Sequence, residues 1–185
     1  HNEIDVATSM GIDTIVTDHH LAPDGPPRAF AVVDPQLGGS RYPFPYLSGA
    51  GLALKLVQGL YSATRRNDSY WREHLLPLAA MGTIADIVPL IDENRSIVRD
   101  GIKEMRETSS PGLLSLIRQS RIERKKLNAS DISWKLAPRL NAAGRMGHAK
   151  TSYDLLVSES TEEANGYAAI LENQNKLRQL QTIEA

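Results

Sequence analysis

Apolar residues recur along the first third of the chain at two different spacings. Helical spacing predicts the end of an amphipathic helix over residues 3–10. A β-branched run then predicts a short strand at Ile12–Thr17, and Ala29–Val33 predicts a second strand. The two strands are followed at once by Asp18 and Asp34, so each predicted strand ends on a carboxylate.

Helical periodicity dominates the rest of the chain. After a Gly/Pro/aromatic loop over residues 36–47, the pattern predicts a strong helix at Ser48–Ala63 and a helical stretch from Tyr70 to Met81, in which Pro77 marks a kink or a restart. An irregular segment is expected at Pro138–Gly147. The other predicted helices cover Asn94–Glu107, Gly112–Gln119, Ser130–Leu136 and Thr161 to the end of the chain.

Strands joined through helices are typical of an α/β fold. We therefore predict an open, mainly parallel sheet, followed by a helical extension and a long connector helix. The chain begins within a helix that leads into a buried-type strand and ends within another helix. This arrangement predicts that the sequence is an internal piece of a longer protein.

Composition narrows the class of protein. The 185 residues are 41% hydrophobic and 23% charged, as in an ordinary globular protein, and suffice for one compact domain. The sequence contains no run of about 18 apolar residues, so no membrane association through a spanning helix is expected. Cysteine is absent, which excludes disulfides, thiolate metal sites and a cysteine nucleophile and fits a reducing cytoplasm, the expected localisation.

The net charge of −1 conceals a strongly basic segment. Residues 118–150 hold nine basic residues against two acidic ones, a local excess of +7. Such an excess suits a face that binds a polyanion, with Arg124, Lys125 and Lys126 as its densest part. The alternative is an ordinary solvated surface of helices and loops.

The first candidate for chemistry is Asp18-His19-His20, directly after the first predicted strand. Open α/β sheets place ligands at the carboxyl ends of their strands. Imidazole and carboxylate groups suit a divalent ion such as Mn²⁺. Adjacent histidines just past a strand are expected to point in different directions, one to a metal and one to a substrate. The alternative is a pair of polar residues in a turn.

Asp86 is the second candidate because it interrupts an otherwise apolar stretch, Ala79–Leu90. A carboxylate in such surroundings must be paired, capped or bound to metal to offset its desolvation. A helix N-cap or a hydrogen-bonded structural aspartate explains it equally well.

The third candidate is the segment Ala137–Gly147. Its small residues let the backbone approach a ligand, Arg139 and Arg145 offer bidentate forks for phosphate, and Asn141 offers an amide. The alternative is a loop whose arginines pair with nearby acids. Within the same basic segment, Trp134 either stacks on a base or, as is more common at helical spacing, belongs to the core.

Four segments in order resemble motifs of the DHH phosphoesterase superfamily, in the form found in its RecJ single-strand-specific exonuclease branch. The DHH triplet itself is a weak signal, whereas four ordered segments are a specific one. The segments are Thr17–His20, Ser48–Ala53, Gly82–Leu90 and Pro138–Arg145.

The resemblance implies a two-metal phosphodiesterase that uses Mn²⁺ or Mg²⁺. By position in the motifs, His19 and Asp86 would be metal ligands, His20 would lie close to the scissile phosphate, and Asp18 would support the histidines or the metals. The residues that match substrate-phosphate contacts are Arg139, Asn141 and Arg145.

The resemblance also implies a division of the chain. Residues 1–160 would be a partial DHH phosphoesterase domain without its N-terminal metal motifs, with residues 94–160 as a helical part that carries the basic segment. Residues 161–185 would begin the connector helix to a DHH-associated domain. We therefore expect the chain by itself to hold two metals poorly and to be inactive.

The implied activity of the full-length protein is 5′-to-3′ degradation of single-stranded DNA in recombination and repair. Single-stranded DNA would be the main partner, with a single-strand-binding protein and a helicase as further ones. Two alternatives stay open: a phosphodiesterase of the same superfamily that acts on oligoribonucleotides, cyclic dinucleotides or pyrophosphate, and a replication scaffold that has lost its catalysis.

Overall fold

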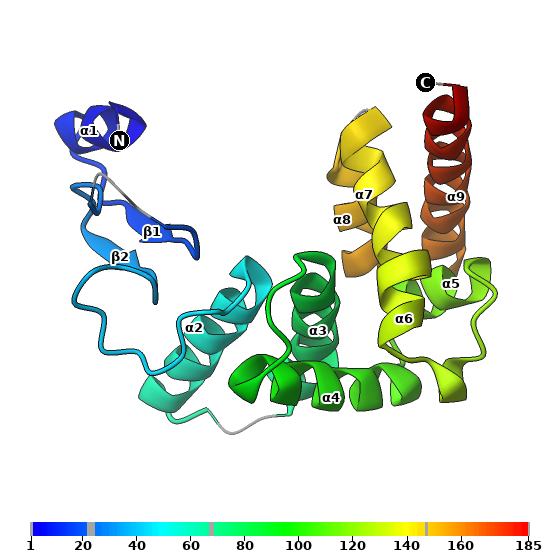
Figure 1. Ribbon diagram of the computed structural model, residues 1–185, viewed down its shortest axis with the longest axis horizontal. Coiled ribbons are helices and arrows are strands. Elements are labelled where there is room, and N and C mark those ends of the chain that lie inside the picture. The colour runs from blue at the N-terminus through cyan, green and yellow to red at the C-terminus, as the bar shows by residue number, and fades with distance from the viewer. Residues whose placement is uncertain (1, 22–24, 67–68, 147, 185) are drawn as a thin grey trace.

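A computed structural model gives the architecture of the chain and describes residues 2–21, 25–66, 69–146 and 148–184. Helix α1 (Asn2–Ser9) leads into β1 (Ile15–Thr17), which pairs in parallel with β2 (Ala31–Val33). Helices make up the rest, with the strand pair at one end of the molecule and α9 at the other (Figure 1). The predicted α/β class with parallel strands and a helical extension is confirmed.

The strands are shorter than the β-branched runs that predicted them. Each spans three residues, with Ile15 opposite Ala31 and Thr17 opposite Val33. The pairing extends one step further, because the Asp18 N–H donates to the Val33 carbonyl at 3.1 Å. The first residue of the predicted site is therefore held by the strand pair itself.

Most of the predicted helices are present with small shifts of their ends. The helical elements are α2 (Gly49–Ala63), a π-helical turn η1 (Trp71–Leu75), α3 (Leu76–Ala85), α4 (Asp92–Glu107), α5 (Pro111–Gln119), a 3₁₀ turn η2 (Arg124–Lys126), α6 (Ala129–Asp131), a second π-helical turn η3 (Ile132–Leu136), α7 (Ala137–Met146), α8 (Lys150–Val157) and α9 (Thr161–Glu184).

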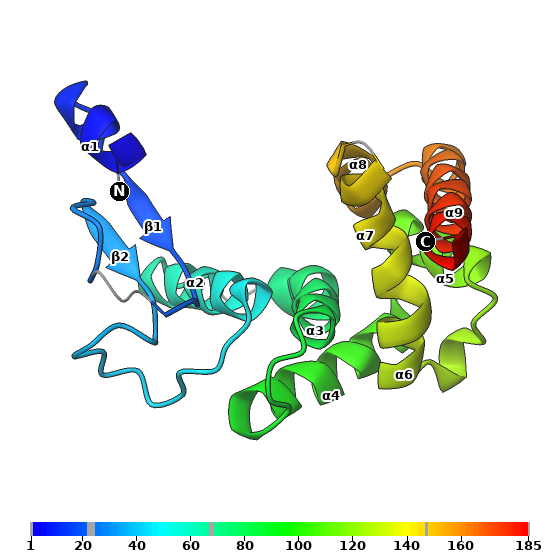
Figure 2. The same ribbon diagram turned by 45° about the horizontal axis from the view of Figure 1, so that its top comes forward.

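Two predictions about the second half were wrong. The segment expected to be irregular, Pro138–Gly147, is helical as far as Met146, with Gly147 outside the described residues. Helix α8 was not predicted at all. Both helices pack against α9 (Figures 1 and 2), and tertiary packing of this kind overrides the weak helical preference of their glycine, asparagine and serine residues.

Pro77 and Pro138 occupy equivalent positions in α3 and α7. Each is the second residue of its helix and follows a π-helical turn. In both, the residue before the proline donates its N–H five residues back, from Leu76 to Trp71 and from Ala137 to Ile132. Because proline has no N–H and its ring crowds the preceding turn, a widened turn is a low-cost way to continue the helix. Pro77 is thus a restart, as the sequence indicated.

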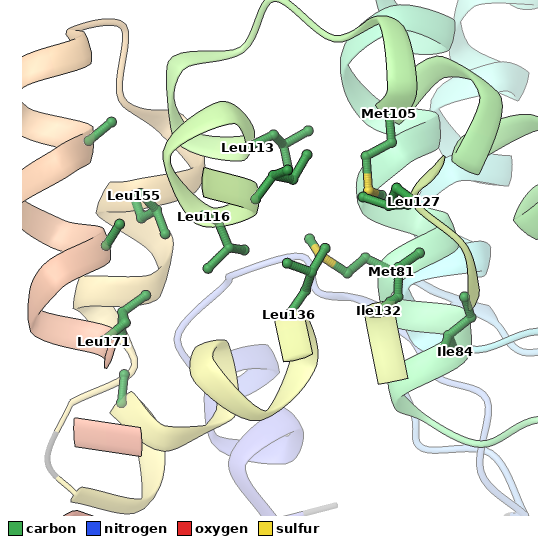
Figure 3. Close-up of a cluster of buried hydrophobic side chains, with 14 of the residues drawn as sticks. Met81, Ile84, Met105, Leu113, Leu116, Leu127, Ile132, Leu136, Leu155 and Leu171 are labelled. Atoms are coloured by element: carbon green, nitrogen blue, oxygen red, sulfur yellow. The ribbon is translucent and has the colours of Figure 1, made fainter. Parts of the chain in front are cut away.

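The larger hydrophobic core joins α3, α4 and the helices that follow (Figure 3). The side chains drawn there come together from segments that are far apart in sequence, with Met81 of α3, Leu116 of α5, Leu136 of η3 and Leu171 of α9 all buried. A second, smaller cluster around Leu52 of α2 packs that helix against α3 and α4. Helix α3 therefore contributes to both cores.

Close approach of α3 to its neighbours depends on two glycines. A Cβ at Gly82 would overlap the side chain of Ala50 on α2, and one at Gly101 of α4 would lie 2.7 Å from the Leu76 carbonyl oxygen. Glycine at these crossings lets the backbones come together. The first crossing fixes α2 and α3 beside the candidate site.

Across the described residues, no helix is both long enough and apolar enough to cross a membrane.

Candidate functional site

Asp18 organises the turn that follows β1. Its Oδ1 accepts hydrogen bonds from the backbone N–H of His19 at 2.7 Å, from the backbone N–H of His20 at 3.2 Å and from the His20 ring Nδ1 at 2.7 Å. The hydrogen bond from the His20 ring, and then that from the His19 backbone, hold the pKa of Asp18 below its ordinary value. An ionised carboxylate only accepts, so Nδ1 of His20 carries the proton and Nε2 is left for another partner.

The two histidine rings lie against each other, with centroids 4.3 Å apart. Both histidines follow β1 directly, and the backbone bends at His20. Their surroundings nonetheless differ: the His19 side chain is 17% exposed and the His20 side chain 73%. His19 faces inward to the pocket, and His20 borders solvent.

Asp86 lies at the carboxyl end of α3, where its backbone N–H donates to the Gly82 carbonyl. The N-cap alternative is therefore excluded. Its Oδ2 is 3.6 Å from Nε2 of His19, and its side chain is 41% exposed. A carboxylate at the negative end of a helix dipole is favoured only when a cation is close.

The pocket between these residues has a volume of about 400 Å³. Gly49, at the start of α2, forms part of its wall, and a Cβ there would be 3.5 Å from the His19 ring. Asn141 of α7 lines the opposite part. The structure thus brings residues of all four motif segments together: the DHH turn, the start of α2, the end of α3 and the middle of α7.

Sequence reasoning missed the polar contacts that support this pocket. Ser48 caps α2 by accepting from the Gly51 N–H, and its hydroxyl lies 3.0 Å from the buried Thr83 hydroxyl of α3. The Gln36 side-chain amide donates to the His19 carbonyl. Serine before a helical run is a recognisable capping signal, whereas nothing in the sequence pairs Gln36 with His19.

The basic residues of the sequence prediction separate into two groups. Arg145 lines a second cavity next to the pocket. Arg139 instead donates from Nε to Glu172 of α9 at 2.6 Å, with both side chains largely buried. For Arg139, the alternative of pairing with an acid is the one the structure shows.

The densest basic cluster also lies elsewhere. Arg124 donates to the Thr108 carbonyl, Lys125 pairs with Glu107 and Lys126 pairs with Glu123. These residues form η2, in the loop at the lower right of Figure 1, where they contact the end of α4. They are not part of the pocket.

His19 and Asp86 provide part of the donor set that a metal ion needs. An imidazole nitrogen and a carboxylate oxygen 3.6 Å apart suit two positions around one Mn²⁺ or Mg²⁺ ion. Within the described ranges no three histidine or acidic side chains converge on one point. The residues present therefore fit a divalent ion, with further ligands needed to complete its coordination.

Comparison with known proteins shows which family and which proteins this chain is similar to. Residues 1–83 match the family described as "DHH family, N-terminal domain". Single-stranded-DNA-specific exonuclease RecJ of Bacillus subtilis is 42% identical over 96% of the chain, and that of Escherichia coli is 36% identical over 96%. The chain is similar to RecJ over nearly its whole length. It spans 22% of the length of the first of these RecJ proteins and 32% of the second.

Solved RecJ structures agree in fold. RecJ from Thermus thermophilus in complex with Mn²⁺ superposes with a TM-score of 0.84 at 30% identity, over 97% of this chain and 26% of that one. An exonuclease RecJ bound to manganese gives 0.82 at 31% identity, over 97% of this chain and 44% of that one. A Thermus thermophilus RecJ complex with Mg²⁺ also matches, with a TM-score of 0.76 over 92% of this chain and 25% of that one.

Proposed function

We propose that this chain carries part of the active site of a RecJ-type exonuclease, a two-metal phosphodiesterase that degrades single-stranded DNA from its 5′ end in recombination and repair. One observation carries the proposal: His19 and Asp86, which are 67 positions apart in sequence, place a nitrogen and an oxygen 3.6 Å apart at one pocket. The similarity to RecJ over nearly the whole chain supports the choice of reaction.

His19 and Asp86 are the residues that would hold a divalent ion. Two such ions, when bound, would supply an activated water and stabilise negative charge on the phosphate and the leaving oxygen. The protein residues orient these groups: Gln36 anchors the His19 backbone, and the Gly82 crossing sets the end of α3.

His20 is the residue we assign to the scissile phosphate. Its Nδ1–H is held by Asp18, which fixes the tautomer and the ring orientation and leaves Nε2 available. Because the ring borders solvent, a phosphate can approach it. Asp18 therefore acts through His20 as a positioning residue.

Helix α7 supplies the remaining contacts to the substrate. Asn141 lies at the pocket, and Arg145 follows one turn later with its guanidinium exposed. We assign both to phosphate oxygens of the strand. Arg139 is left out of this set because its guanidinium is already paired with Glu172.

The test uses the full-length protein that contains this chain, with Mn²⁺ and end-labelled single-stranded DNA, beside duplex DNA and a dinucleotide. We expect stepwise loss of the single strand from its 5′ end. Asp86→Asn should lower the rate by at least about 100-fold, since even the loss of a group that only orients a metal ligand costs about 10–100-fold. Asp13→Asn, an exposed aspartate two residues before β1, is the matched control and should leave the rate unchanged.

Three other outcomes would contradict parts of the proposal. Cleavage of the dinucleotide alone would move the protein to the branch of the superfamily that acts on small substrates. No turnover of any substrate would favour the scaffold. Full activity in Asp86→Asn would remove Asp86 from the metal site.

A further inference from the structure

A second cavity, of about 900 Å³, opens beside the pocket. It lies between the loop after α3, the face of η3 and α7, and the far part of α9. Ala85 and Asn141 line both spaces, so the cavity adjoins the pocket that holds His19 and Asp86. A strand bound at the pocket would extend next to this groove.

The lining of the groove suits a polyanion. It includes the guanidinium groups of Arg145 and Arg178 and contains no carboxylate among the described residues. In the described ranges Arg145 has no hydrogen-bond or ion-pair partner, and Arg178 donates only to the neutral amide oxygen of Asn175. The positive charge is therefore not neutralised within this part of the chain.

An aromatic side chain stands in the same groove. Trp134 is 79% exposed, so it lies outside the core of the described residues, although its helical spacing suggested a core position. Trp134, Pro138, Asn141 and Arg145 are four, three and four residues apart, so they form one stripe along η3 and α7. The rise from Trp134 to Asn141 is about 10 Å, the rise of up to about three nucleotides stacked at duplex spacing.

Ile87, which follows the C-cap of α3, also lines the groove. Ile87 has a φ of +59°, in the left-handed region that β-branched residues rarely adopt, and its side chain is 89% exposed. Arg65 and Arg121 also have a positive φ, each directly after the C-cap of its helix, so this backbone conformation is the one that ends a helix here. An apolar side chain held out of the core here adds a second apolar surface to the groove.

We propose that this groove is a base-stacking subsite for single-stranded nucleic acid, in which Trp134 stacks on a base one to three nucleotides from the phosphate at Asn141 while Arg145 and Arg178 face the backbone. The proposal rests on the proposed function for its choice of polymer. Three features favour a nucleic-acid strand over a protein segment: cations without carboxylates, an exposed indole and a position next to the pocket.

The experiment measures binding without cleavage. Full-length protein with Asp86→Asn is titrated into dye-labelled oligothymidylate, and the dissociation constant is read from fluorescence anisotropy. Trp134→Ala in this background should weaken binding by roughly 5- to 100-fold, the usual effect of one base–aromatic stack, and Trp134→Phe should retain most of the affinity. Tyr153→Ala removes a similarly exposed aromatic from α8, outside the groove, and should leave affinity unchanged.

Strands with one abasic unit, placed in turn at the first six positions, locate the stacked base. One position should weaken binding to Asp86→Asn protein and have no further effect on the Trp134→Ala protein. Affinity that does not change in Trp134→Ala, or that falls equally in Trp134→Phe, would overturn the subsite. A lower melting temperature with unchanged affinity would assign the groove to a protein segment instead.

The proposed function and the subsite fail separately. If the protein without Asp86→Asn digests single strands while Trp134→Ala leaves affinity unchanged, the subsite is wrong and the exonuclease stands. If Trp134-dependent binding is found but no metal-dependent cleavage, the exonuclease is wrong and the subsite stands.

Discussion

Arg139 and Arg145 lie six residues apart on α7, and their side chains have different surroundings. The Arg139 guanidinium is 15% exposed and pairs with Glu172, which is 13% exposed, so it ties α7 to α9. Arg145 is exposed beside the groove. The sequence of the motif does not show which arginine forms an ion pair and which stays exposed, because the partner of Arg139 is 33 positions away.

Arg139→Ala should destabilise the full-length protein by about 1–3 kcal/mol, because the largely buried Glu172 carboxylate loses its partner at 2.6 Å and keeps only Lys176, whose Nζ is 3.5 Å from its other oxygen. Urea unfolding of the full-length protein measures this. A double variant, Arg139→Ala with Glu172→Ala, should recover part of the loss because no buried charge remains.

Arg145→Ala is the matched comparison on the same helix. It should change the free energy of unfolding by no more than about 0.5 kcal/mol. The slope of log binding constant against log salt concentration should fall by about one, the loss of one phosphate contact. Unchanged stability in Arg139→Ala, together with weaker DNA binding, would instead return Arg139 to the phosphate contacts that the sequence suggested.

At the scale of the elements, the crossing of α2 and α3 determines the geometry of the pocket. Gly82 at this crossing is four residues before Asp86, and Ser48 and Thr83 bridge the same two helices through their hydroxyl groups. The start of α2 and the end of α3 therefore move together.

Gly82→Ala should cost about 1–3 kcal/mol of stability, because its methyl group overlaps Ala50 and pushes the helices apart. It should also reduce Mn²⁺-dependent activity, since Asp86 moves with α3. Urea unfolding and the single-strand digestion assay measure the two effects. Adding Ala50→Gly should recover part of both.

Gly59→Ala in α2 is the control, because nothing lies within 4 Å of the position its Cβ would take. It should raise stability by up to about 1 kcal/mol through better helix propensity and leave activity unchanged. A loss of activity in Gly59→Ala as large as that in Gly82→Ala would show that the crossing is not the cause.

Helices were predicted correctly where the spacing of apolar side chains and a capping residue determine them. They were missed where packing against a distant helix determines them. Residues 48–63 carry a capping serine and a regular apolar face, and a helix forms there. Pro138 and Gly144 are breakers by local preference, yet a π-helical turn and the packing on α9 keep α7 helical. Local propensity contains no information about a partner helix far along the chain.

For the candidate site, motif positions identified Asp18, His19, His20, Asp86 and Asn141, and the structure brings them to one region. The supporting contacts were not predictable: Gln36 to His19 and Ser48 to Thr83 are pairings between distant residues with no local signature. Single positions can be proposed from a sequence, whereas side-chain pairings need the fold.

The described residues pack into two hydrophobic clusters, and α3 and α4 contribute side chains to both. In the proposed site they would offer a divalent ion two donors, His19 and Asp86, where Mn²⁺ takes about six. The number of ligands, rather than the stability of the fold, should therefore limit metal binding by the 185 residues alone.

We expect the purified 185-residue chain to bind Mn²⁺ at least about 100-fold more weakly than the full-length protein and to release no nucleotides. Calorimetric titration with Mn²⁺ measures the affinity, and circular dichroism of the same sample verifies that the helices are formed. Tight binding of two ions by the folded chain would show that ligands outside the pair His19 and Asp86 were overlooked.

The two widened turns before Pro77 and Pro138 have a consequence for how this sequence can change. A helix advances by about 100° per residue, so removing one residue from either turn would rotate everything after it by that angle. Asp86 follows the first turn and Asn141 the second, and both would leave the pocket although no contact residue had been replaced. An insertion or deletion at either turn therefore changes the rotation of the helix that follows it. Related chains should keep the number of residues between each turn and the pocket.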